Sequence, residues 1–161
     1  MIFPRRIKFR LVATTDKGGS VYTTISLGSG DLEAKTFSET TTLKTDMEII
    51  ADSSATVAVD DNSKKIDGNE YTLRIKLSGT GSTTKRAIHC TNVAKGTYKI
   101  AWISGSKNNT RAIVISDGTN QLATAENNGN EITSTSFTVS SDGGDVYIYG
   151  EAAINIYGIY Q

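Results

Sequence analysis

Two cationic side chains on one short segment are the first residues in this sequence whose types and spacing could do chemistry. In Tyr71–Leu77 (YTLRIKL), apolar residues alternate with Thr72, Arg74 and Lys76. A two-residue alternation is typical of a β-strand with one buried face, so Arg74 and Lys76 are expected on the opposite face. Most of the acids lie in turn-like segments. This distribution favours a surface that binds over a pocket that reacts.

Few other residues could hold a metal ion. His89 and Cys90 are the only residues of their kinds, which excludes an internal disulfide and a zinc site with the usual number of ligands. Four aspartates lie within Asp52–Asp67, and calcium ligands cluster in such loops. Their spacing matches no EF-hand, however, and Asx-turns explain them without a metal. We therefore predict no cofactor, with a structural calcium ion as the minor alternative.

Size and charge exclude several classes of protein. The 161 residues suit one domain, and 17 basic residues balance 17 acidic ones, which argues against a protein held to nucleic acid by net charge. No apolar run reaches the ~20 residues that a membrane helix needs, and the N-terminal residues lack the apolar region of a signal peptide. Neither nucleic acid nor a membrane is an expected partner.

The elements that must position these side chains are short strands. Alternating segments separated by turn signals recur at roughly 8–12 residues, which is typical of a sandwich or jelly roll. In Ala152–Tyr160, Ile154 and Ile156 alternate with Asn155 and Tyr157, which predicts one buried and one presented face. Trp102 is expected in the core, with a sugar-stacking surface as the alternative. The predicted fold is all-β, an antiparallel, jelly-roll-like β-sandwich over residues 46–161.

Residues 1–45 are predicted to form an N-terminal, strand-rich arm. Strands are expected at Arg6–Ala13 and Val21–Leu27, with a short one within Leu32–Phe37, and a turn is expected much later, at Asp60–Ser63. The alternative is that the arm is simply two more strands of the same sandwich. Its basic start is explained either as an edge strand guarded by charge or as a docking element for an acidic partner.

Four segments of the chain, taken together and in order, carry a family resemblance. They are Ala58–Tyr71, Arg74–Ile88 (RIKLSGTGSTTKRAI), Tyr98–Ile115 and Val146–Ile159 (VYIYGEAAINIYGI). In this order they resemble the β-sandwich module appended to bacterial pectate lyases and other pectinolytic enzymes. The resemblance covers about residues 47–160. The chain departs from the pattern at Leu73, where the family often has lysine, at Trp102, and at Ala152-Ala153, where a glycine pair is usual.

The resemblance implies a non-catalytic carbohydrate-binding module that holds an enzyme on pectin. In such modules, surface lysines and arginines pair with the carboxylates of galacturonan, and charge-assisted hydrogen bonds suit that task. The matching positions here are Arg74, Lys76, Arg86 and Arg111, and we add Lys85 and Lys107 as cationic neighbours. No catalytic residue is predicted.

A second hypothesis comes from a different class of protein. The chain could be a structural surface protein, such as a decoration protein of a phage virion or of a cell-surface assembly, anchored by strand addition through residues 1–45. An initiating Met1, the missing export signal and the basic arm favour it. Either hypothesis predicts an extracellular or surface-exposed protein. An independent lyase or hydrolase is disfavoured because glycoside hydrolysis needs two opposed carboxylates. The sequence leaves the oligomeric state and the ligand's identity open.

Overall fold

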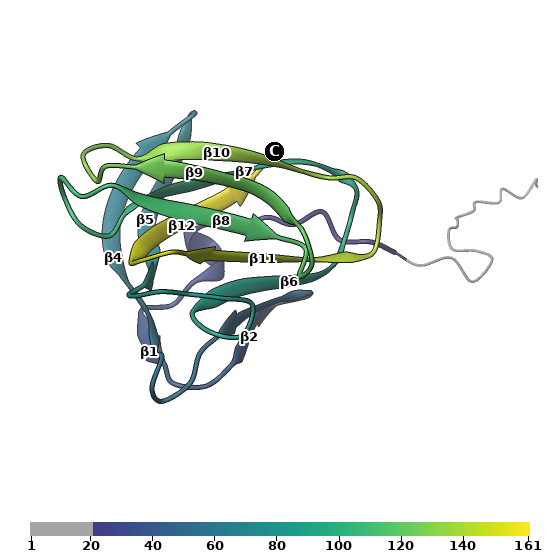
Figure 1. Ribbon diagram of the computed structural model, residues 1–161, viewed down its shortest axis with the longest axis horizontal. Coiled ribbons are helices and arrows are strands. Elements are labelled where there is room, and N and C mark those ends of the chain that lie inside the picture. The colour runs from purple at the N-terminus through teal and green to yellow at the C-terminus, as the bar shows by residue number, and fades with distance from the viewer. Residues whose placement is uncertain (1–20) are drawn as a thin grey trace, which may run out of the picture.

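A computed structural model describes residues 21–161, in which two antiparallel six-stranded sheets form a sandwich (Figure 1). Sheet 1 has the order β1 (Lys35–Phe37), β4 (Val57–Ile66), β5 (Asn69–Leu77), β12 (Ile154–Tyr160), β7 (Gly96–Ser104) and β10 (Thr133–Val139). Sheet 2 has the order β2 (Thr41–Lys44), β3 (Met47–Ile50), β6 (Ala87–Val93), β11 (Gly144–Gly150), β8 (Arg111–Ser116) and β9 (Gln121–Asn127). Helix within the described residues is limited to the 3-10 turn η1 (Ser29–Asp31). The predicted all-β, jelly-roll-like sandwich is confirmed.

The core lies between the sheets and is built from alternate strand positions. Sheet 1 contributes Ile75, Ile100, Trp102 and Ile156, and sheet 2 contributes Ile49, Ile88, Ile113 and Ile148, all fully buried. Each such side chain stabilises the fold by about 1.5–3 kcal/mol relative to an exposed one. The Trp102 indole donates a hydrogen bond from Nε1 to Thr135 Oγ1 at 2.8 Å. The prediction that Trp102 belongs to the core is therefore correct.

β12 lies in the middle of sheet 1, between β5 and β7, and is the yellow strand in Figure 1. It pairs with β5 only at Ile154–Ile156. Its register against β7 shifts between Ile156 and Gly158. On the outer side of the sheet, Tyr157 packs in a second apolar cluster with Tyr71, Ala101 and Ile103. Tyr71, which the alternation groups with Ile75, thus belongs to the outer cluster, because β5 leaves β12 before reaching it.

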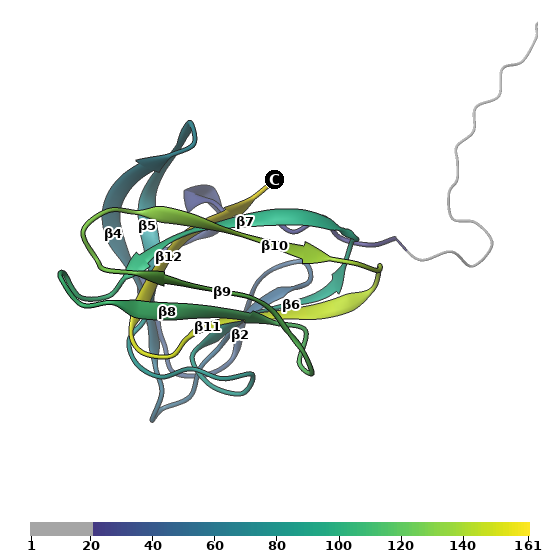
Figure 2. The ribbon, with the colours of Figure 1, turned by 45° about the horizontal axis from the view of Figure 1, so that its top comes forward.

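Two local predictions are wrong. Asp60–Ser63 is not a turn but part of β4, whose register against β5 shifts between Asp61 and Lys64. Cross-strand pairing explains this, since Asp60 lies opposite Arg74 and the hairpin turns later, at Asp67-Gly68, where both residues have positive φ. Figure 2 shows the β4–β5 hairpin projecting above the neighbouring strands. Val21–Leu27 forms only isolated bridges, at Thr23 and Leu27.

The predicted arm is described only in part. Arg6–Ala13 and the basic start lie outside residues 21–161. Of the rest, β1 and β2 form one outer strand in each sheet, and Ile25, Leu27 and Phe37 lie in the core. The role of residues 1–45 as an anchoring arm remains a prediction.

Candidate functional site

A groove of about 200 Å³ lies on the outer face of sheet 1, away from the core. It is formed where the β4–β5 hairpin faces the loop after β7, above the central strand β12. Its lining residues are Asn62, Lys64, Arg74, Ile103, Ser104, Gly105, Ser106, Lys107, Gly129, Asn155 and Tyr157. Three cations and two side-chain amides thus converge there from separate strands and loops.

Two larger hollows of the described residues offer a different chemistry. One, of about 450 Å³, lies beside the β9–β10 loop and is lined by Glu126 and Glu131. The other, of about 420 Å³, lies on the β4–β5 hairpin, where Lys65 and Glu70 form an ion pair with 2.7 Å between Nζ and Oε1. The first hollow is lined by carboxylates. The second shares Lys64 with the groove on sheet 1 and adds only the paired Lys65, so the groove is the better candidate for an anionic ligand.

Tyr157 forms the floor of the groove. Its side chain is buried, and its hydroxyl donates to Asn62 Oδ1 at 2.5 Å. The ring contacts Tyr71 in a tilted arrangement, with 6.3 Å between centroids. Burial raises the pKa of the Tyr157 phenol, so the hydroxyl remains a hydrogen-bond donor at neutral pH. The Asn62 side chain is held in place by that bond.

Arg74 brings a fixed guanidinium to one side of the groove. Its Nε donates to Asp60 Oδ1 at 2.7 Å, and its Nη2 lies 3.4 Å from Asp60 Oδ2. The Arg74 hydrogen bond is the main reason that the pKa of Asp60 is lowered, so this carboxyl stays ionised at neutral pH. Two of the five guanidinium N–H donors are used in this way, and three are left for other acceptors.

The opposite wall is the loop Ser104–Lys107, which is held by buried hydrogen bonds. Asn127 Oδ1 accepts from the backbone N–H groups of Ser104 at 2.9 Å and Gly129 at 2.7 Å, and Asn127 Nδ2 donates to Glu131 O at 2.8 Å. Gly129 has a φ of +80°, and a Cβ there would overlap the Ser106 carbonyl. Only glycine fits this position, so the wall is closely packed.

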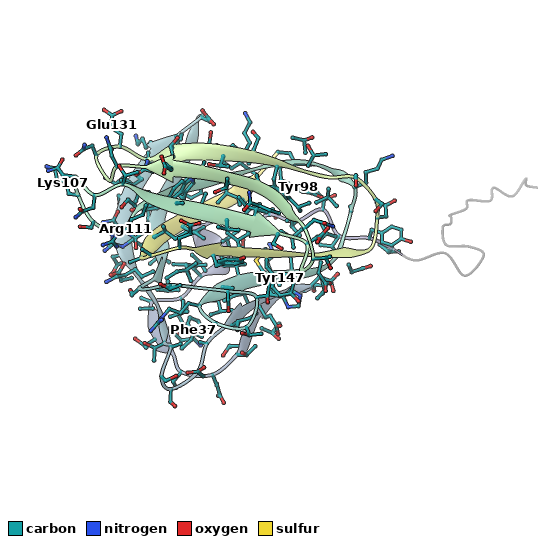
Figure 3. The ribbon with its side chains drawn as sticks, viewed as in Figure 1. Phe37, Tyr98, Lys107, Arg111, Glu131 and Tyr147 are labelled. Carbon is teal, nitrogen blue, oxygen red and sulfur yellow. The ribbon has the colours of Figure 1, made fainter. Side chains whose placement is uncertain are left out.

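The same wall is tied to the end of β11 and the start of β12. Ala153 O accepts hydrogen bonds from the Gly105 N–H at 2.8 Å and from Arg111 Nη1 at 3.1 Å. Arg111 therefore supports the wall and does not line the groove. Figure 3 shows Lys107 and Glu131 at the end of the sandwich where these loops meet, with Arg111 behind them.

The structure brings together only part of the set predicted from the sequence. Arg74 and Lys107 line the groove, and Lys76 Nζ lies 3.3 Å from Asp60 Oδ2, so it shares that carboxylate with Arg74. Lys85 and Arg86 lie in the β5–β6 loop. There Arg86 makes long hydrogen bonds to Thr80 O (3.5 Å) and Ser54 O (3.4 Å).

Nine of the eleven lining residues were absent from the predicted set, among them Asn62, Lys64, Asn155 and Tyr157. The alternation in Ala152–Tyr160 does separate Asn155 and Tyr157 from the core-facing isoleucines, so a signal for these two was present. The expected presented face is wrong, however, because both residues are buried on the outer side of the sheet. Asn62 and Lys64 carry no such signal, since they depend on the irregular stretch of β4.

Three of the four aspartates considered as calcium ligands have other partners. Asp52 Oδ1 accepts from the Ser54 N–H at 2.7 Å, as in an Asx-turn, Asp60 pairs with Arg74, and Asp67 accepts from the Tyr160 hydroxyl at 2.6 Å. Between residues 21 and 161, no three His, Cys, Asp or Glu side chains are grouped so as to hold a metal ion. In the same range, no helix has the length and hydropathy that a bilayer crossing requires.

Comparison with known proteins gives structural neighbours only. No protein-family model and no curated protein matches the sequence. The carbohydrate-binding module CBM6-3 of Clostridium stercorarium, solved with cellobiose, is 11% identical, with 89% of this chain and 96% of that chain covered and a TM-score of 0.45. A module from a Cellvibrio mixtus lichenase, solved with cellotriose, is 11% identical over 63% of this chain and 84% of that one, with a TM-score of 0.41.

A third neighbour is an exo-β-1,3-galactanase from Phanerochaete chrysosporium, solved with β-1,3-galactotriose. It is 14% identical, with 88% of this chain and 30% of that chain covered and a TM-score of 0.45. None of these three is described as a pectate-lyase module. The neighbours include carbohydrate-binding β-sandwiches, and what the groove binds is inferred from its own residues.

Proposed function

We propose that the protein is a non-catalytic binding module for an acidic polysaccharide of the pectin or homogalacturonan type, and that the groove on sheet 1 holds the ligand. One observation carries the proposal: Lys64, Arg74 and Lys107 converge on a groove whose lining contains no carboxylate. Among residues 21–161, Asp60 is the one acid paired with these cations, so the positive charge of the lining exceeds the negative charge beside it.

The chemistry of a polyuronate suits this arrangement. Each sugar unit offers one carboxylate, and hydrogen bonds between a carboxylate and a guanidinium or ammonium group are about twice as strong as neutral ones. The hydroxyl groups of the sugar can pair with amides, which both donate and accept, and Asn62 and Asn155 supply them. The groove therefore offers partners for both kinds of group on a uronate.

The same lining supports binding without bond cleavage. Glycoside hydrolysis uses two carboxyl groups on opposite sides of the scissile bond. The groove residues between 21 and 161 include no Asp, Glu or His, so they supply neither a general acid nor a nucleophile of that kind.

Affinity electrophoresis in native gels containing polygalacturonate tests the proposal. The variant Lys64→Ala/Lys107→Ala removes two cations that form no ion pair within the described residues. Loss of two charge-assisted hydrogen bonds, about 1.5 kcal/mol each, predicts a fall in affinity of roughly a hundredfold. Fully methyl-esterified pectin, whose carboxylates are neutralised, should give little retardation.

The matched control is Lys35→Ala/Lys95→Ala, which removes the same charge at two exposed positions that do not line the groove. This variant should be retarded as strongly as the wild type. Equal loss in both double variants would locate the binding surface elsewhere, and a wild-type protein that polygalacturonate does not retard would refute the proposed function.

A further inference from the structure

Asn155 places a mostly buried side-chain amide at the groove on sheet 1. It lies on β12, the middle strand of sheet 1, is 7% exposed, and lines the groove. No hydrogen bond to its side chain occurs within residues 21–161. A side-chain amide both donates and accepts hydrogen bonds. The Asn155 amide can therefore bind a polar group that enters the groove.

The position of Asn155 in the sheet fixes what that partner can reach. Asn155 lies opposite Lys76 on β5 and opposite Ile103 on β7. Arg74 is two residues before Lys76, on the same outer face. Diagonal neighbours on adjacent strands are about 7–8 Å apart. The Arg74 guanidinium and the Asn155 amide can thus hold opposite ends of one small polar molecule.

The size of the groove limits how much ligand it encloses. Its 200 Å³ is below the range of about 300–1,000 Å³ usual for pockets that hold drug-sized ligands. A groove of this volume suits one sugar unit better than several. The wall at Ser104–Lys107 packs against Gly129 and Ala153, so the groove cannot widen without repacking two loops.

We propose that the groove is a subsite for one uronate unit, in which Lys64, Arg74 and Lys107 hold the carboxylate and the Asn155 amide hydrogen-bonds a ring hydroxyl. This inference rests on the proposed function and specifies how much of the polysaccharide the groove recognises, namely one sugar unit. The sugars on either side of the bound unit lie outside the groove and contribute little to affinity.

Titration of the isotopically labelled protein with D-galacturonate and with trigalacturonate, followed by NMR, tests the inference on the unmodified protein. D-galacturonate should shift the side-chain NH₂ signals of Asn155. Trigalacturonate should bind no more than about threefold more tightly, which is the statistical factor for three equivalent units. A tenfold or larger gain from one unit to three, or unshifted Asn155 NH₂ signals at saturation, would overturn it.

Substitution adds a second measurement. Asn155→Ala should weaken D-galacturonate binding by about threefold to tenfold, since one neutral hydrogen bond is lost. Asn130→Ala, an exposed amide whose side chain has no hydrogen bond among the described residues, is the matched control and should bind as the wild type does. D-galactose, which lacks the carboxylate, should bind at least tenfold more weakly than D-galacturonate.

The outcomes separate this inference from the function on which it rests. If polygalacturonate retards the wild-type protein but D-galacturonate does not bind, or if Asn155→Ala binds it unchanged, the single-unit subsite is wrong and acidic-polysaccharide binding stands. If neither the polymer nor the monosaccharide binds, both proposals are wrong.

Discussion

Arg74 and Asp60 form a side-on ion pair across β4 and β5, with Arg74 Nε donating to Asp60 Oδ1 at 2.7 Å. The second oxygen of the same carboxylate lies 3.3 Å from Lys76 Nζ. Asp60 therefore uses the donors that a carboxylate of the ligand would use. Asp60 orients Arg74, but it also competes with a ligand carboxylate for the N–H donors of Arg74.

Removing that competition should strengthen binding. Asp60→Asn keeps the shape of the side chain and frees Arg74 and Lys76 from the ion pair. We expect a two- to fivefold gain in affinity for polygalacturonate, since exposed ion pairs are typically worth about 0.2–1 kcal/mol. The dependence on salt should become steeper, since more charge faces the ligand. Asp61→Asn is the control with the same charge change. Weaker binding by Asp60→Asn would show that orienting Arg74 matters more than competing for it.

Stability should fall in acid. The pKa values of Asp46, Asp52, Asp60 and Asp117 are lowered in the folded protein, the first chiefly by the Thr23 hydroxyl and the third chiefly by Arg74. Groups with a lowered folded pKa stabilise the fold above their unfolded pKa of about 3.9 and lose that contribution as the pH falls through the folded value. The urea midpoint should thus drop steadily below about pH 4, and Asp46→Asn should flatten the drop. A midpoint that rises on acidification would contradict this.

Cys90 should be chemically silent in the native state. It is fully buried, and burial raises the pKa of its thiol to about 12. Since the thiolate is the reactive form, Ellman's reagent at pH 8 should label the native protein only as fast as it unfolds. Labelling should be complete in denaturant. Rapid stoichiometric reaction of the native protein would show that the core opens around β6.

The hydrogen bond between Trp102 and Thr135 offers a test of the core. Thr135→Val leaves the buried indole N–H without a partner, so we expect a loss of about 1–3 kcal/mol in the free energy of unfolding. Ser136→Ala, at an exposed serine on the same strand, should change stability by less than about 0.5 kcal/mol. Urea unfolding followed by the fluorescence of the single tryptophan measures both.

Two glycines with the same backbone angle separate wall packing from backbone strain. Gly68 and Gly129 have φ values of +79° and +80°, but a Cβ at Gly68 meets nothing within 4 Å. Gly68→Ala should therefore lower the free energy of unfolding only by the strain of a left-handed alanine, about 1–2 kcal/mol. Gly129→Ala should lower the free energy of unfolding by more than this, and it should also weaken polygalacturonate binding, because the Ser104–Lys107 wall must move. Equal losses of stability in the two variants would mean that the wall can move at little energetic cost.

The regular parts of this fold could be predicted from the sequence, because alternation reports directly which side chains face the core. Ile154 and Ile156 are buried as expected, and Trp102 takes a core position for the same reason. The stretch Asp60–Ser63 could not be predicted in this way. Its polar residues have turn propensity, and only their pairing with β5 keeps them in a strand.

The candidate site was predictable to the extent that it depends on strand alternation. Arg74 stands on the outer face because its neighbours Leu73 and Ile75 turn inward. Asn62 and Lys64 reach the groove through a register shift, and the Lys107 wall depends on contacts with Gly129, more than twenty residues away. Long-range pairing of that kind leaves no periodic trace in a sequence. Strand alternation therefore fails to predict the groove residues that irregular backbone segments position.

The central place of β12 also decides when this protein can fold. The half of sheet 1 made by β1, β4 and β5 meets the half made by β7 and β10 only through β12. During synthesis, those halves remain separate and have exposed edges until residues 154–160 have left the ribosome. Sheet 1 is therefore completed only after β12 has been made, and a nascent chain stalled before Ile154 is expected to be a substrate for chaperones and proteases.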